Sequence, residues 1–191
     1  MNFPEYLDRW LIGLESIHAP PPKYQAATKD EIGALCEKFQ HEIDENLIAW
    51  WEVANGTPER FPFLGVFTDE NTLCNFCSLD HISIFFRGEP IRLSYDDGYA
   101  IDEFHDARIQ NGWSNSLWLP FASCNGDSTL VMVDYAPTEL GTLGQIIAFQ
   151  HDGDAIYWIA DSFSDYLEKS LAVVIAEKEF AKEWIDLLRD R

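Results

Sequence analysis

The chain has 191 residues, 47% of them hydrophobic, and its 33 acidic residues against 13 basic ones give a formal net charge of −20. This length suits a single domain with a substantial core. The charge argues against binding to nucleic acid or to anionic membranes, because both depend on clusters of Lys and Arg. Acidity that serves only solubility is the simpler interpretation of this charge, and a basic protein partner is the alternative.

The sequence shows no sign of secretion or of a membrane span. Its first ten residues form neither a basic segment nor a long apolar one, and no run approaches the roughly 18 apolar residues that a span needs. The four cysteines, Cys36, Cys74, Cys77 and Cys124, are too sparse for a disulfide framework. We therefore expect a soluble, cytoplasmic protein with reduced thiols.

Helix signals fill the first third of the chain. Apolar residues spaced by three and four predict a helix over residues 3–17, which the prolines at 20–22 end. Thr28 and Glu31 form a capping box that marks the start of a second helix. Asp44 is the expected N-cap of a third helix.

These signals divide the chain into three parts. Residues 1–22, the first helix and its Pro-rich spacer, are predicted to be an appendage to the main domain. The main domain is expected over residues 23–177, and a C-terminal helix over residues 178–191.

The middle of the chain is less regular. Residues 63–67 predict a short strand. Residues 80–86 fit either a strand, from their alternating isoleucines, or a helix capped by Asp80, and we favour the helix. A short amphipathic helix is expected around residues 101–109.

The C-terminal half carries the strand signals. Four apolar runs predict strands at residues 117–122, 129–135, 145–150 and 156–160. Turn residues at 125–127 and 152–154 favour antiparallel pairing, and Ser162 with Asp165 marks the start of a further helix. The order of elements predicts a single α+β domain whose helices pack on a mainly antiparallel central sheet.

Cys74 and Cys77 form a C-x-x-C motif. A zinc site needs two such pairs or an added pair of histidines, and a thioredoxin-like site needs a βαβ context. Neither is evident, so we expect ordinary small apolar thiols, no metal and no cofactor.

Acidic residues and histidines near the turns raise the alternative of a hydrolase. Asp127, Asp134 and His151 would serve one only if their side chains converged in one pocket. Asp127 is typical of a turn, and Asp134 ends a strand ahead of Pro137. No histidine stands in a recognisable nucleophile motif, so we expect no catalytic residue and a protein that is not an enzyme.

The acidic stretch over residues 94–106 is the strongest candidate for a functional surface, because it contains aromatic side chains and no Lys or Arg. One interpretation is a solvated helix face. The other is a docking surface whose aromatic side chains anchor a cationic partner and whose charges steer its approach. The expected partner-binding residues are Tyr95, Asp96, Asp97, Tyr99, Asp102 and Glu103.

Five segments, in order along the chain, resemble the Smi/Knr branch of the SUKH superfamily. Residues 44–56, DENLIAWWEVANG, resemble its acidic helix that ends in Asn-Gly. Residues 118–122, WLPFA, resemble its W-[IL]-P-[IF]-A strand, and residues 126–134 resemble its G-D segment with the strand that follows. Residues 141–152 resemble its G-x-x-G-Q element, and residues 160–167 its closing helix start.

The resemblance implies an α+β protein-binding domain. It further implies an immunity protein that neutralises a bacterial nuclease-type toxin by binding it, or alternatively a regulator or scaffold in cell-wall biogenesis. The region 78–112 matches the family least and the N-terminal helix lies outside the family domain, so partner specificity is expected at one of these two places. The family-motif residues are interpreted as scaffold, and they are Trp118, Gly126, Asp127, Asp134, Gly144 and Gln145.

Overall fold

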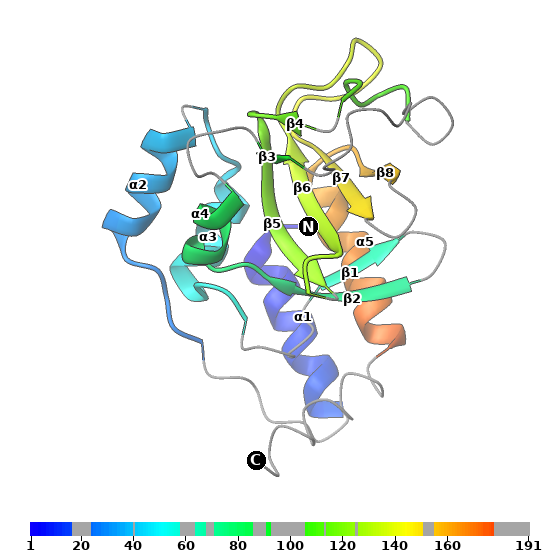
Figure 1. Cartoon of the computed structure of the whole chain (residues 1–191). Helices are drawn as coiled ribbons and strands as arrows, with labels where there is room; N and C mark the ends of the chain where they lie inside the picture. Colours follow the sequence, from blue (N-terminus) through cyan, green and yellow to red (C-terminus); the bar gives the residue numbers. More distant parts are fainter. Residues whose placement is uncertain are drawn as a thin grey trace.

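The fold is built on an antiparallel sheet. The computed structural model describes residues 1–16, 24–39, 41–57, 64–67, 71–85, 91–92, 106–112, 114–124, 126–150 and 155–177. The strands are β1 (Leu64–Phe67), β2 (Asn71–Phe76), β3 (Ile91–Arg92), β4 (Ser114–Asn115), β5 (Trp118–Cys124), β6 (Thr129–Asp134), β7 (Gln145–Gln150) and β8 (Ala155–Ala160). The main sheet has the order β1-β2-β5-β6-β7-β8 with every neighbouring pair antiparallel, and β3 pairs with β4 separately (Figure 1).

Helices cover this sheet. Within the described residues they are α1 (Phe3–Ser16), α2 (Lys29–Phe39), α3 (Glu45–Val53), α4 (Leu79–Phe85) and α5 (Phe163–Ala176). In Figure 1, α1 and α5 lie side by side behind the sheet, and α2, α3 and α4 lie together at the left of the view, next to β5. The architecture is the single α+β domain that the sequence predicts. None of the helices in this part of the chain combines the length and the apolarity that a membrane crossing requires.

Capping side chains explain where three helices begin. The Thr28 hydroxyl accepts a hydrogen bond from the Glu31 amide (3.2 Å), and the Glu31 carboxylate accepts one from the Thr28 amide (2.7 Å). This is the predicted capping box, and it satisfies two amides that lack partners inside α2. The carboxylate of Asp44 caps α3 and the hydroxyl of Ser162 caps α5, as predicted.

In the middle of the chain the structure differs from the predictions at β2 and at the cap of α4. Strand β2 was not expected, because its sequence NTLCNF shows little apolar alternation; it is stabilised by pairing with β1 on one side and β5 on the other. Helix α4 is confirmed, but its cap is Ser78, whose hydroxyl accepts from the His81 amide (3.1 Å), and not Asp80. The helix expected at 101–109 falls mainly outside the described residues, and residues 106–109 form a turn.

Both faces of the central strands are buried. Alternate residues of β6 point to opposite sides of the sheet. Val131 and Val133 join the core cluster formed with α1, α3 and α5. Leu130 and Met132 join a second apolar cluster on the other face, against which Phe85 of α4 packs. The strands are thus held by apolar contacts on both sides.

Helix α1 is an integral part of the main core. Its buried side chains are Phe3, Tyr6, Trp10 and Leu14. The ring of Phe3 stacks on Trp50 of α3, with centroids 4.6 Å apart. The structure therefore corrects the expectation of an appended helix, because these four side chains of α1 lie in the core with α3 and α5, and Leu7 and Leu11 pack partly buried against it. The division of the chain at residues 22 and 178 stays a prediction.

Replacing Trp10 tests the contribution of α1. Trp10→Ala is expected to lower the free energy of unfolding by about 3–5 kcal/mol, because it opens a large cavity in the core. Ile12→Ala is the matched control in the same helix: Ile12 is 64% exposed, so its replacement is expected to change stability by less than about 0.5 kcal/mol. Urea unfolding of the wild type and of both variants measures these effects. Equal midpoints for the two variants would contradict the placement of α1 in the main core.

Candidate functional site

A buried carboxylate, Asp134, lies at the end of β6. Its side chain is fully buried. One oxygen, Oδ1, accepts hydrogen bonds from Trp118 Nε1 (3.1 Å) and from the amide of Ala136 (2.8 Å). The other, Oδ2, accepts from Gln145 Nε2 (2.9 Å). Burial raises the pKa of this carboxyl, against the three hydrogen bonds, which each act to lower it.

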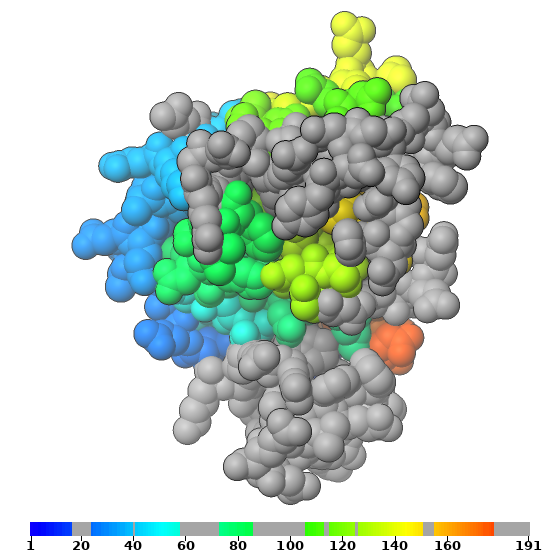
Figure 2. Space-filling view, in the orientation of Figure 1, coloured from blue at the N-terminus to red at the C-terminus, as the bar shows by residue number. Residues whose placement is uncertain are grey.

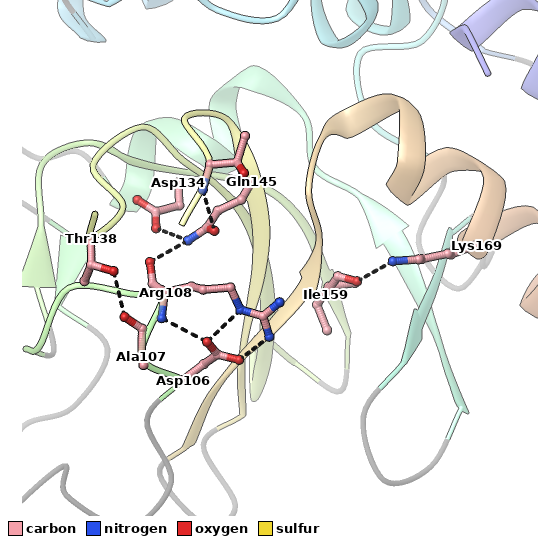
Figure 3. Close-up of polar contacts among 9 residues, drawn as sticks. Asp106, Ala107, Arg108, Asp134, Thr138, Gln145, Ile159 and Lys169 are labelled. Carbon is pink, nitrogen blue, oxygen red and sulfur yellow. Dashed lines mark hydrogen bonds and ion pairs between the residues drawn. The ribbon is translucent and has the colours of Figure 1, made fainter. Parts of the chain in front are cut away.

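Gln145 extends this network to a neighbouring segment. It lies opposite Asp134 in the register of β6 and β7. Its Nε2 also donates to the backbone oxygen of Arg108 (3.0 Å), and its Oε1 accepts from the amide of Thr142 (3.2 Å). Figure 3 shows Gln145 between Asp134 and Arg108. One amide side chain therefore joins two strands, the loop after β6 and the turn at residues 106–109.

The loop over residues 135–144, which connects β6 to β7, is fixed by these contacts. The Thr138 amide donates to the Arg108 oxygen (3.0 Å), and the Thr138 hydroxyl donates to the Ala107 oxygen (2.6 Å; Figure 3). A Cβ atom at Gly141 would lie 2.5 Å from the Arg108 oxygen, so only glycine fits at this position. Gly144 has a φ of +83°, and its amide donates a hydrogen bond to the backbone oxygen of Asp134 (2.9 Å).

This rigid loop presents two apolar side chains to solvent. Leu140 is 73% exposed and Leu143 is 63% exposed. In Figure 2 the same loop, coloured yellow, protrudes at the top of the molecule. Exposed apolar side chains on a fixed backbone suit contact with another protein, because little conformational entropy is lost when they are covered.

Two cations lie against one aromatic ring near the network. The guanidinium of Arg108 lies 3.7 Å from the ring centroid of Trp158 on β8, and Lys169 Nζ of α5 lies 4.7 Å from it. Arg108 also forms a two-bond ion pair with Asp106, which raises the pKa of the guanidinium (Figure 3). Lys169 pairs with Asp165 (2.9 Å). Both positive charges are therefore neutralised within the protein.

The structure separates the motif residues into two groups. Trp118, Asp134, Gly144 and Gln145 meet in the network, whereas Gly126 and Asp127 form the turn before β6. Both turn residues have positive φ, 66° and 68°.

The proposed hydrolase cluster does not assemble as required. Asp127 precedes β6 and Asp134 ends it, so about 3.3 Å per residue places them about 20 Å apart. Asp127 instead contacts His81 Nε2 (3.1 Å), and Asp134 is fully engaged in the network. His151 lies outside the described residues. Across the described ranges, no three His, Cys, Asp or Glu residues gather as metal ligands.

The structure describes the residues of the network but not the predicted partner-binding residues. The predicted binding surface lies outside the described residues and stays a prediction; its residues are Tyr95, Asp96, Asp97, Tyr99, Asp102 and Glu103.

The roles of Arg108 and Trp158 were not predicted from the sequence. In the sequence Arg108 stands out only as an isolated basic residue soon after the acidic stretch, because Gln145 and Trp158, which it also contacts, are distant along the chain.

Gly141→Ala tests the packing of the loop on the turn. We expect a loss of about 1–3 kcal/mol of unfolding free energy, because the added methyl group must displace backbone at Arg108. Gly33→Ala is the matched control: it lies in α2 with nothing within 4 Å of the added Cβ, and it should stabilise the protein by about 0.5–1 kcal/mol. Thermal and urea unfolding distinguish the two. A neutral Gly141→Ala variant would show that the loop is not held against Arg108.

The pKa shift of Asp134 gives a pH-dependent prediction. Its folded pKa lies above its unfolded pKa, so the folded state binds the proton more tightly and this carboxyl contributes stability at low pH. That contribution is lost as the pH rises through the folded pKa. The wild type should therefore lose stability relative to Asp134→Asn as the pH rises above about 4, the ordinary pKa of an unfolded Asp. A relative gain over that range would show that the three hydrogen bonds outweigh burial.

Comparison with known proteins identifies the scaffold that carries this site. A search of curated proteins finds no match to the chain. The family model described as SMI1 / KNR4 family (SUKH-1) matches residues 26–169, which is well over half of the chain. The matched range includes the whole network, the loop and the Trp158 stack. The chain therefore belongs to the SMI1 / KNR4 family (SUKH-1), in agreement with the resemblance found in its sequence.

Proposed function

We propose that this chain is an immunity protein, which neutralises a nuclease-type bacterial toxin by binding it in the cytoplasm. The observation that carries the proposal is the excess of 33 acidic over 13 basic residues in a member of a family with a general protein-binding role. A nuclease needs a cationic face for its anionic substrate. A strongly acidic protein is complementary to that face and occludes it stoichiometrically, without catalysis of its own.

The internal use of basic side chains supports this proposal. Arg108 and Lys169 are each paired with a carboxylate and packed on Trp158. Arg9 is also paired, more loosely, with Glu5 (3.9 Å). Each of these pairs cancels one positive and one negative charge, and the chain as a whole keeps a formal net charge of −20, so the long-range field that a partner meets is negative. Such a field accelerates the approach of a basic protein.

The proposed binding surface combines the acidic segment with the rigid loop. The acidic segment over residues 95–103 continues into the turn at 106–109, which is bonded to the loop through Thr138 and Gln145. Leu140 and Leu143 stand on that loop. Charges on the segment would steer the partner, and the leucines would be covered on contact. A regulator or scaffold of cell-wall biogenesis is the alternative role, and it predicts no toxin partner.

Charge reversal at the acidic segment tests the surface. A variant with Asp96, Asp97, Asp102 and Glu103 all changed to Lys should bind the toxin domain encoded beside its gene at least tenfold more weakly than wild type. Most of the loss should lie in the association rate, and it should shrink at high salt. Surface plasmon resonance at low and high salt measures this, and survival of cells that co-express the toxin reports neutralisation.

A second reversal variant provides the matched control. Asp8, Glu15, Glu37 and Glu52 are exposed helix residues far from the loop in sequence, and changing all four to Lys alters net charge by the same amount. This variant should retain most of the affinity. Equal losses of affinity in both variants would show that net charge governs binding and that the acidic segment is not the binding surface. Survival without any binding, or no toxic neighbour to neutralise, would contradict the immunity role and favour the regulatory one.

A further inference from the structure

Two buried thiols face each other across strands β2 and β5. The strands pair antiparallel with Asn75 opposite Ser123 and Phe76 opposite Ala122. The next step in this register places Cys74 opposite Cys124. Their sulfur atoms are 2.7 Å apart, with Cys74 donating to Cys124. All four cysteines of the chain are free thiols in this structure.

The backbone geometry at this position suits a covalent bond. The Cys77 amide donates to the Phe121 oxygen (2.8 Å), which marks these two residues as a hydrogen-bonded pair. Alternation along an antiparallel ladder then makes Cys74 and Cys124 a non-hydrogen-bonded pair, with Cα atoms about 4.5 Å apart and side chains on one face. A disulfide needs Cα atoms about 4.4–6.8 Å apart and a sulfur–sulfur distance of about 2.05 Å. The sulfurs need to approach by only about 0.6 Å.

We propose that Cys74 and Cys124 are an oxidative modification site, where a small-molecule disulfide of the glutathione type installs a reversible cross-strand disulfide. Register and contact select this pair over the C-x-x-C pair recognised in the sequence. Cys77 lies opposite the Phe121 backbone, and its thiol bonds to the Ser123 side chain. Cys36 lies on α2, away from this ladder.

The two thiols have different roles in the reaction. Cys124 is 5% exposed at the end of β5, whereas Cys74 is fully buried. The hydrogen bond from Cys74 lowers the pKa of Cys124, and burial raises the pKa of Cys74. Because the thiolate is the nucleophile, Cys124 attacks the small disulfide first.

The exchange balances in two steps. The Cys124 thiolate bonds to one sulfur of the small disulfide, and the other sulfur leaves as a thiolate that takes up a proton. Cys74 then loses its proton, bonds to Cys124 Sγ and displaces the second small thiol. Two protein thiols are oxidised by two electrons, and one small disulfide is reduced to two thiols.

The bond would change how the sheet is held together. The hairpin of β1 and β2 joins the remaining strands of the main sheet through the short pairing of β2 with β5. A covalent link at Cys74 and Cys124 ties this hairpin to β5. The loop that it closes also contains the acidic residues 95–103, whose freedom in the unfolded chain it restricts.

The test treats the full chain with oxidised glutathione and maps its disulfides by mass spectrometry after alkylation in denaturant. A Cys36→Ala background removes the half-buried thiol outside the ladder. In this background the cross-linked peptide should join Cys74 to Cys124, with Cys77 alkylated and full reversal by dithiothreitol. Adding Cys77→Ala should leave the cross-link intact, whereas adding Cys74→Ala should stop the reaction at a glutathione adduct on Cys124.

Measurements on wild type keep the proposal testable if a variant fails to fold. Oxidised wild type should show the same Cys74–Cys124 peptide and a higher urea midpoint than reduced wild type, with the increase lost in dithiothreitol. A Cys74–Cys77 bond, a stable glutathione adduct as the only product, or four thiols left unreacted would each overturn the proposal. These results do not depend on whether the chain binds a toxin.

Discussion

The carboxylate of Asp134 is removed from water, so its hydrogen-bond partners have to come from the protein. An ionisable group buried without partners would cost several kcal/mol. Trp118, Gln145 and the amide of Ala136 meet that demand. Each partner belongs to a different part of the chain, so satisfying one carboxylate aligns the ends of β5, β6 and β7 and holds the loop after β6 against the turn at 106–109.

The same constraint explains why the family signature describes a scaffold. Asp134 and Gln145 are fully buried and fully bonded, so they cannot touch a partner without breaking the network. The groups available for recognition are those that the network positions, such as Leu140 and Leu143 on the loop. Family members can therefore share this network and differ in what they bind, because the two tasks fall on different residues.

A proline in a central strand shows how local irregularity serves the sheet. Pro120 lacks an amide donor, which excludes it from regular central strands. The register of β5 against β6 shifts between Pro120 and Ala122, a bulge that leaves Phe121 unpaired on that side. The Phe121 oxygen instead accepts from the Cys77 amide at the end of β2. The bulge thus helps to set the register that brings Cys74 and Cys124 together.

The sequence alone determined the elements whose signals lie within a few residues: the caps at Thr28, Asp44 and Ser162, and the four strands of the C-terminal half. The family motifs were also legible, since turn and strand residues are contiguous. Tertiary structure decided what depends on distant partners. Strand β2 exists because β1 and β5 flank it, α1 joins the core because α3 and α5 offer a surface, and Arg108 acquires its role from Gln145 and Trp158. Long-range contacts leave no local pattern, so no reading of neighbouring residues predicts them.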